Sequence, residues 1–70
     1  MTRAEALAIA RACTLEHMWR FQQLYQAGEV HIDEDGNLPG EQLRMVEDAS
    51  EKTVKHLEAM IAEEKATVTA

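Results

Sequence analysis

The sequence predicts an all-α protein: an antiparallel helical hairpin that dimerises into a four-helix bundle. Two stretches with a helical period of apolar residues, about 2–27 and about 39–66, are separated by residues 28–38, which break that period. The chain has 70 residues, enough for one domain, and we assign all of it to a single helical hairpin. A domain of this size buries little surface and is marginally stable without a staple or a partner.

The first helix has clear start and stop signals. Thr2 is followed three residues later by Glu5, which is the pattern of a capping box. Residues 4–25 contain no glycine or proline and many alanines, so their helix propensity is high. Gly28 suits the left-handed position that follows a helix.

The apolar face of this first helix is wide. All three aromatic residues of the chain lie between residues 19 and 25. Leu15 and Trp19 extend the apolar face on one flank, so that it covers about half of the helix circumference. A single neighbouring helix needs only a narrow seam, and we therefore expect this helix to touch at least two others. The central stripe consists of Leu7, Ala10, Thr14, Met18, Phe21 and Tyr25.

The middle segment is a long connection for two packed helices. Val30 and Ile32 alternate with polar residues, as in a short extended stretch, and Asp35-Gly36 is a turn signal. Asn37 is a plausible N-cap for the next helix, with Pro39 close behind it. The segment either pairs as a short strand with its copy in a second subunit or folds over the end of the bundle.

The second helix has a narrower apolar face with heptad-like spacing. Residues 67–70 lose this pattern, and we expect them to fray. Charged residues four positions apart are expected to pair along its exposed side, at Arg44–Asp48, Asp48–Lys52 and Glu51–Lys55. The apolar positions are Leu43, Val46, Ser50, Thr53, Leu57 and Met60, with Val54 and Ile61 beside them.

A lone hairpin would leave one flank of the wide first helix in water. Docking of two hairpins removes that exposure, which predicts a homodimer. The residues expected at the dimer interface are Leu7, Thr14, Met18, Phe21, Tyr25, Leu43, Val46, Val54, Leu57 and Ile61.

No constellation predicts catalysis, a metal or a cofactor. The three histidines, His17, His31 and His56, have no metal-ligand spacing. The acidic segment that begins at Asp33 lacks the glycine and glutamate of an EF-hand. No histidine lies one turn from Ser50, and the chain has no glycine-rich phosphate loop. We expect a protein that is not an enzyme.

The charge distribution favours a protein partner with a basic surface. The net charge is −6, with three arginines against two glutamates in residues 1–27 and four basic against eleven acidic residues in residues 28–70. An acidic surface disfavours nucleic acid and anionic membranes. Trp19 is either part of the dimer core or an anchor for a partner. The expected partner-binding residues are Trp19, Leu15, Glu29, His31, Asp33, Glu34 and Asp35.

These features favour a small, non-catalytic, homodimeric regulator of phage or plasmid type. It would bind and inhibit a larger protein, such as a nucleic-acid-binding or transcriptional regulator. One alternative is a structural or assembly subunit of a larger complex. Another is an RNA-binding dimer, because two helices joined by one turn in an acidic chain resemble the Rop family in shape, although no residue motif matches. No apolar run is long enough to span a membrane, and the single cysteine, Cys13, favours the cytoplasm.

Overall fold

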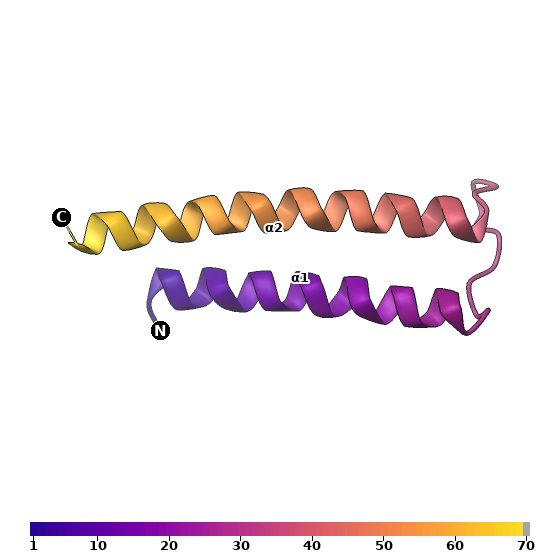
Figure 1. The fold of residues 1–70 in the computed structure, drawn as a ribbon, viewed down its shortest axis with the longest axis horizontal. Helices are drawn as coiled ribbons and strands as arrows, with labels where there is room; N and C mark the ends of the chain where they lie inside the picture. Colours follow the sequence, from indigo (N-terminus) through magenta and orange to yellow (C-terminus); the bar gives the residue numbers. More distant parts are fainter. Residues whose placement is uncertain (70) are drawn as a thin grey trace.

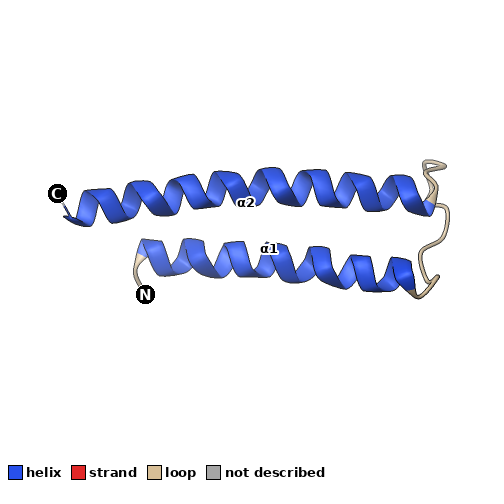
Figure 2. Cartoon of the chain, viewed as in Figure 1, coloured by secondary structure: helices blue, strands red, loops and turns tan. Residues whose placement is uncertain are grey.

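Two antiparallel helices form the fold in the computed structural model of the chain. Helix α1 spans Arg3–Gln26 and helix α2 spans Pro39–Thr69. The structure describes the backbone of residues 1–69 and the side chains of residues 1–67. Both ends of the chain lie at one end of the hairpin, and the connection lies at the other (Figure 1). Residues 1–69 contain no strand, so the all-α hairpin predicted from the sequence is confirmed (Figure 2).

Helix α1 begins at its expected cap. The Thr2 hydroxyl accepts a hydrogen bond of 3.1 Å from the backbone N–H of Glu5. Thr2 itself has an extended backbone, as an N-cap residue should. One of the orphan N–H groups at the start of the helix is thus satisfied by the residue that the sequence indicated.

The end of α1 is a Schellman motif. Gly28 takes a left-handed backbone with φ of +73°. The N–H of Gly28 bonds the Tyr25 carbonyl, and the N–H of Glu29 bonds the Leu24 carbonyl, each at 3.0 Å. These are the two bonds that define the motif, and they satisfy the last carbonyls of the helix.

The connection folds around the carboxylate of Asp33. One oxygen, Oδ1, accepts the backbone N–H groups of Asp35 at 3.0 Å and Asn37 at 2.9 Å. The other, Oδ2, accepts the Asn37 side-chain amide at 3.0 Å. Gly36, with φ of +83°, completes the tight turn that Asp35-Gly36 predicted.

Helix α2 begins at Pro39, as predicted, but its N-cap residue and its end differ from the prediction. Its first turn is closed by a 3.0 Å bond from the Gln42 N–H to the Leu38 carbonyl, so Leu38 occupies the N-cap position. The N-cap assignment of Asn37 is wrong, because its side chain bonds Asp33 instead. The other end of the helix lies at Thr69, beyond the predicted end at about residue 66, and the fraying expected of residues 67–70 stays a prediction. The expectation for Ala70 lies outside the described residues.

The two helices meet along one interhelical seam. Its residues follow 3-4 heptad spacing on both helices, which keeps them facing one partner. Val54 is the one buried hydrophobic residue among those described, at 9% exposure. The half-buried apolar positions of the seam are Ala4, Leu7, Leu15, Met18 and Phe21 of α1 and Leu43, Val46, Leu57, Met60 and Ile61 of α2.

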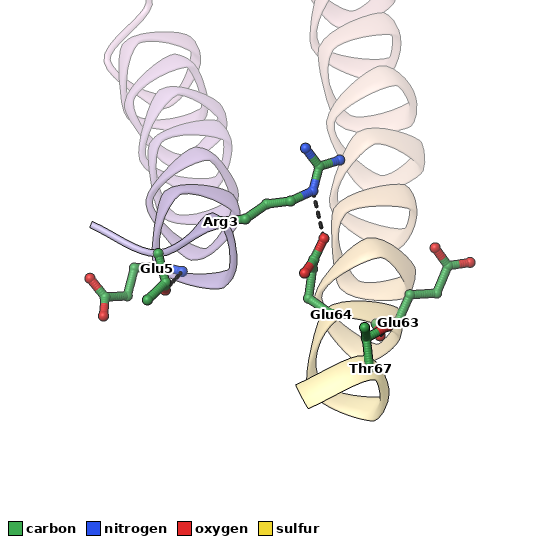
Figure 3. A network of polar contacts seen from close by, with 6 residues as sticks. Arg3, Glu5, Glu63, Glu64 and Thr67 are labelled. Atoms are coloured by element: carbon green, nitrogen blue, oxygen red, sulfur yellow. Dashed lines mark hydrogen bonds and ion pairs between the residues drawn. The ribbon is translucent and has the colours of Figure 1, made fainter. Parts of the chain in front are cut away.

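Two ion pairs among the described residues join α1 to α2. Arg3 of α1 reaches Glu64 of α2 at 2.6 Å near the open end of the hairpin (Figure 3). Arg11 reaches Glu58 through two of its nitrogens, each at 3.2 Å. Exposed long side chains gain little from pairing along one helix, because water screens them. The ion pairs expected at Arg44–Asp48, Asp48–Lys52 and Glu51–Lys55 are not among those of the described residues.

The hairpin is long and thin, with principal extents of 50 × 17 × 17 Å. Its radius of gyration is 15.6 Å, whereas a compact chain of 70 residues would have about 11 Å. Within residues 1–69, neither helix is long and apolar enough to cross a membrane.

The left-handed backbone of Gly28 gives a first testable prediction. A Gly28→Ala change should lower the free energy of unfolding by about 1 kcal/mol, because a Cβ is strained at positive φ. Urea denaturation followed by circular dichroism at one fixed protein concentration measures it.

Gly40→Ala is the matched control for this prediction. Gly40 lies in the first turn of α2, and an added Cβ would meet only the Tyr25 hydroxyl at an ordinary 3.8 Å. This change should leave stability unchanged or raise it by up to about 1 kcal/mol. Equal losses in both variants would contradict the Schellman motif.

Candidate protein-binding surfaces

One long face of the hairpin is charged. Arg11 pairs with Glu58 across the seam, and the Gln22 amide donates a 2.9 Å hydrogen bond to the Glu47 carboxylate. Between these contacts lies an open groove of about 260 Å³ whose floor includes Leu15. We call this surface the charged face; it consists of Arg11, Leu15, Trp19 and Gln22 of α1 and Glu47, Glu51, Lys55 and Glu58 of α2.

The opposite long face carries no Asp, Glu, Lys or Arg along its middle. Each of its residues lies one or two positions along the sequence from a charged-face residue, and at roughly 100° per residue this places it on the other side of the seam. The Arg3–Glu64 ion pair closes this side near the open end of the hairpin (Figure 3). We call this surface the uncharged face; it consists of Ala10, His17, Phe21 and Leu24 of α1 and Val46, Ala49, Thr53 and Met60 of α2.

Trp19 lies at the outer border of the charged face. Its side chain is 53% exposed, although tryptophan is the largest apolar residue in the chain. It lines a hollow on the outer surface of α1 together with Glu16, His17, Arg20 and Gln23. The seam with α2 therefore forms without using most of the Trp19 side chain.

Leu15 and Trp19 differ in their surroundings. Leu15 is half-buried in the groove of the charged face, and Trp19 is exposed one turn further along α1. The acidic connection begins at Gly28, about 14 Å further along the helix axis at 1.5 Å per residue. The residues predicted to bind a partner thus form two separate patches, one on a flank of α1 and one at the end of the hairpin.

The acidic connection uses one of its carboxylates internally. Hydrogen bonds from the Asn37 backbone and side-chain amides, and then from the backbone of Asp35 and Gly36, hold the pKa of Asp33 below its ordinary value. Gln42 ties the connection to α2 by donating to the carbonyls of His31 at 2.6 Å and Asn37 at 2.9 Å. The polar side chains that remain exposed there are Glu29, His31, Glu34 and Asp35, and the apolar side chains of Ile32 and Leu38 are exposed beside them.

No metal-ligand cluster is present within residues 1–69. No group of three or more histidine, cysteine or acidic side chains comes close enough together to hold an ion. The alternation of Glu29, His31, Asp33 and Asp35 does not become one side of a strand, because the chain turns around Asp33.

The residues expected at a dimer interface lie mostly in the seam of the single chain. Eight of the ten are half-buried between α1 and α2, Val54 is buried, and Tyr25 is 38% exposed beside the first turn of α2. The eight are Leu7, Thr14, Met18, Phe21, Leu43, Val46, Leu57 and Ile61.

Sequence reasoning missed the uncharged face as a surface. Ala10, His17 and Leu24 recur at seven-residue intervals beside the seam, where coiled coils usually carry charges. That spacing was the available signal. Recognising the surface also requires knowing which flank of α2 lies beside these residues, and the Arg11–Glu58 and Gln22–Glu47 contacts establish this.

Comparisons of the chain with protein-family models, curated proteins and solved structures find no match. The functional argument therefore depends on the surfaces themselves.

The Asp33 turn gives a prediction for pH dependence. The folded-state pKa of Asp33 is lowered, so its ionised carboxylate stabilises the folded turn. This stabilisation is complete above the unfolded-state pKa and is lost as the pH falls through the folded-state pKa. A carbon-13 NMR titration should place the Asp33 inflection below its ordinary value, with the Asn37 and Asp35 amides losing protection over the same range.

Asn37→Ala serves as the control for the titration. It removes the side-chain donor to Asp33 but retains the backbone donor, so it should move the Asp33 inflection part of the way back. An Asp33 inflection at or above the ordinary value in the unmodified chain would contradict the proposed turn.

Proposed function

We propose that this chain is a small, non-catalytic, homodimeric regulator that binds and inhibits a larger protein. The observation that supports the proposal best is the exposure of Trp19, at 53% of its side chain. Trp19 is the largest of the apolar residues that the interhelical seam leaves exposed. Tryptophan is among the residues that most often dominate the energy of protein–protein contacts.

The surroundings of Trp19 suit a partner side chain. Glu16, Arg20 and Gln23 lie around it on the outer surface of α1 and can form a polar rim. An apolar anchor enclosed by a rim that excludes water is the usual arrangement of an interface hot spot.

The acidic connection suggests the charge of the target. Glu29, Glu34 and Asp35 are exposed at one end of the hairpin, and the whole chain has a net charge of −6. A basic surface, such as that of a nucleic-acid-binding or transcriptional regulator, complements these charges and would associate faster at low salt. The single cysteine favours a reducing compartment, and we propose the cytoplasm.

The homodimer is part of the same proposal. Val54 is the one buried hydrophobic residue among those described, and a core this small gives marginal stability. A second hairpin would complete a four-helix bundle and take half-buried seam residues such as Phe21, Val46 and Met60 further from water.

The ion pairs of α1 weigh against an RNA-binding dimer of the Rop type. Arg3 and Arg11 each already contact a glutamate of α2. Their positive charge is then largely cancelled before any phosphate arrives, and phosphate contacts need an uncompensated positive field.

The assembly-subunit alternative predicts self-association with no other stoichiometric partner.

Sedimentation equilibrium tests the dimer. A mass near twice 7.9 kDa at micromolar concentration is expected, with helicity that falls on dilution because the monomer is marginal. A fully helical monomer throughout this range would contradict the proposal.

Affinity capture from cells that produce the protein tests the regulator. The unmodified chain should retain one basic protein in stoichiometric amount, and Trp19→Ala should weaken its binding by about 2 kcal/mol or more. The interaction should also weaken with added salt. Inhibition of the captured protein's own activity by the purified chain completes the test.

Ile9→Ala is the matched control for this experiment. Ile9 is also on α1 and 50% exposed, but it lies outside the hollow around Trp19. It should leave capture unchanged. Self-association alone would favour the assembly subunit, co-purified RNA would favour the Rop-type dimer, and either result would contradict the regulator.

A further inference from the structure

We infer that the second copy of the chain docks on the uncharged face, so that Trp19 remains free on the outside of the dimer. This inference rests on the homodimer of the proposed function and adds the surface through which it forms. It differs from the sequence-based expectation, in which Leu15 and Trp19 mark the flank that needs another chain.

Charge separates the two faces. A two-fold dimer brings the same surface of both copies together. On the charged face this would bury five charged side chains from each copy, three acidic and two basic, and charged groups are costly to remove from water. They are Glu47, Glu51, Glu58, Arg11 and Lys55. The uncharged face brings no charged side chains together along its middle. At its end, Arg3 is already paired with Glu64 of the same chain.

The threonine hydroxyls on and beside the uncharged face donate hydrogen bonds within the chain. The Thr53 hydroxyl donates to the Ala49 carbonyl at 2.8 Å, and the Thr14 hydroxyl donates to the Ala10 carbonyl at 2.9 Å. Since these hydroxyl donors are already used, burial of this face would leave neither of them without an acceptor.

The side chains of this face combine small and large residues. Ala10 and Ala49 allow close approach of a second helix, whereas Phe21, Leu24 and Met60 supply apolar area. Phe21 and Met60 are half-buried, and Leu24 is 36% exposed, so each has surface left to bury. His17 lies in one row with Ala10 and Leu24, and His56 lies toward the border of the face.

The exposed area of the hairpin matches what a dimer needs. The chain exposes 5425 Å², whereas a compact monomer of this mass would expose roughly 4,400 Å². The excess, roughly 1,000 Å², is close to the area of about 800 Å² that each partner contributes to a standard interface. Covering one long face by a second copy accounts for this excess.

A pair of lysine substitutions tests the face directly. Ala10→Lys places a charge on the uncharged face, and Ala8→Lys places the same charge on the charged flank two residues away. Both alanines are exposed in the hairpin, so neither lysine is forced into the seam. Ala10→Lys should raise the dimer dissociation constant about tenfold or more, whereas Ala8→Lys should leave it nearly unchanged. Ala49→Lys repeats the test from α2.

The fluorescence of Trp19 gives a second measurement that needs no substitution. If the second copy covers the uncharged face, Trp19 in the folded dimer should keep a red-shifted emission maximum and ready quenching by acrylamide, as expected from its 53% exposure in the single hairpin. A blue-shifted emission maximum and protection from acrylamide in the dimer would place the second copy over Trp19 and overturn the inference. This measurement shows which face the second copy covers even where Ala10→Lys prevents folding.

The outcomes separate the inference from the proposed function. A dimer that Ala8→Lys weakens as much as Ala10→Lys, or that neither weakens, overturns the assigned face but leaves the homodimeric regulator intact. A helical monomer at all concentrations overturns the homodimer itself. If Trp19→Ala abolishes capture of the partner and leaves the dimer unchanged, the result supports both the homodimeric regulator and the assigned dimer face.

Discussion

The limited burial available to two helices is the constraint on which the rest of this structure depends. A hairpin has one seam, and in this chain only Val54 of the described hydrophobic residues is buried by it. The remaining seam residues, such as Leu7 and Leu57, keep part of their surface in water. Because folded proteins are stable by only a small margin, a fold of this kind depends on its helix ends and on its neighbours as much as on its core.

The two ends of the connection supply part of what the core lacks. Gly28 closes α1 with the two bonds of a Schellman motif, and Asp33 gathers the backbone of the following turn with its carboxylate. Gln42 then joins that turn to the first turn of α2. This local ordering fixes where α2 starts and therefore which residues face each other along the seam. The long connection is thus an ordered part of the fold, which explains how so many residues can join two packed helices.

The sequence predicted those parts of the fold that depend on local rules. Thr2 and Gly28 indicated the ends of α1, and the heptad spacing indicated the seam. It failed where one side chain had two possible partners: Asn37 could cap α2 or bond Asp33, and the second contact was made. The two faces of the hairpin were not predicted, because they depend on which flank of α1 lies beside which flank of α2. The contacts that establish this arrangement join residues far apart in the sequence: Arg11 and Glu58 are 47 residues apart, and Gln22 and Glu47 are 25 residues apart.

The separation of the two faces has a consequence for the proposed regulator. If self-association uses the uncharged face, it does not compete with a target for Trp19, so dimer formation and target binding can occur together. A two-fold dimer would then carry two tryptophans on its outside, related by the same axis. Such an arrangement suits a target that is itself two-fold symmetric, because the second contact becomes intramolecular once the first has formed and binding gains strength without any new contact. A hairpin too small to bind tightly through one side chain could in this way inhibit a much larger protein.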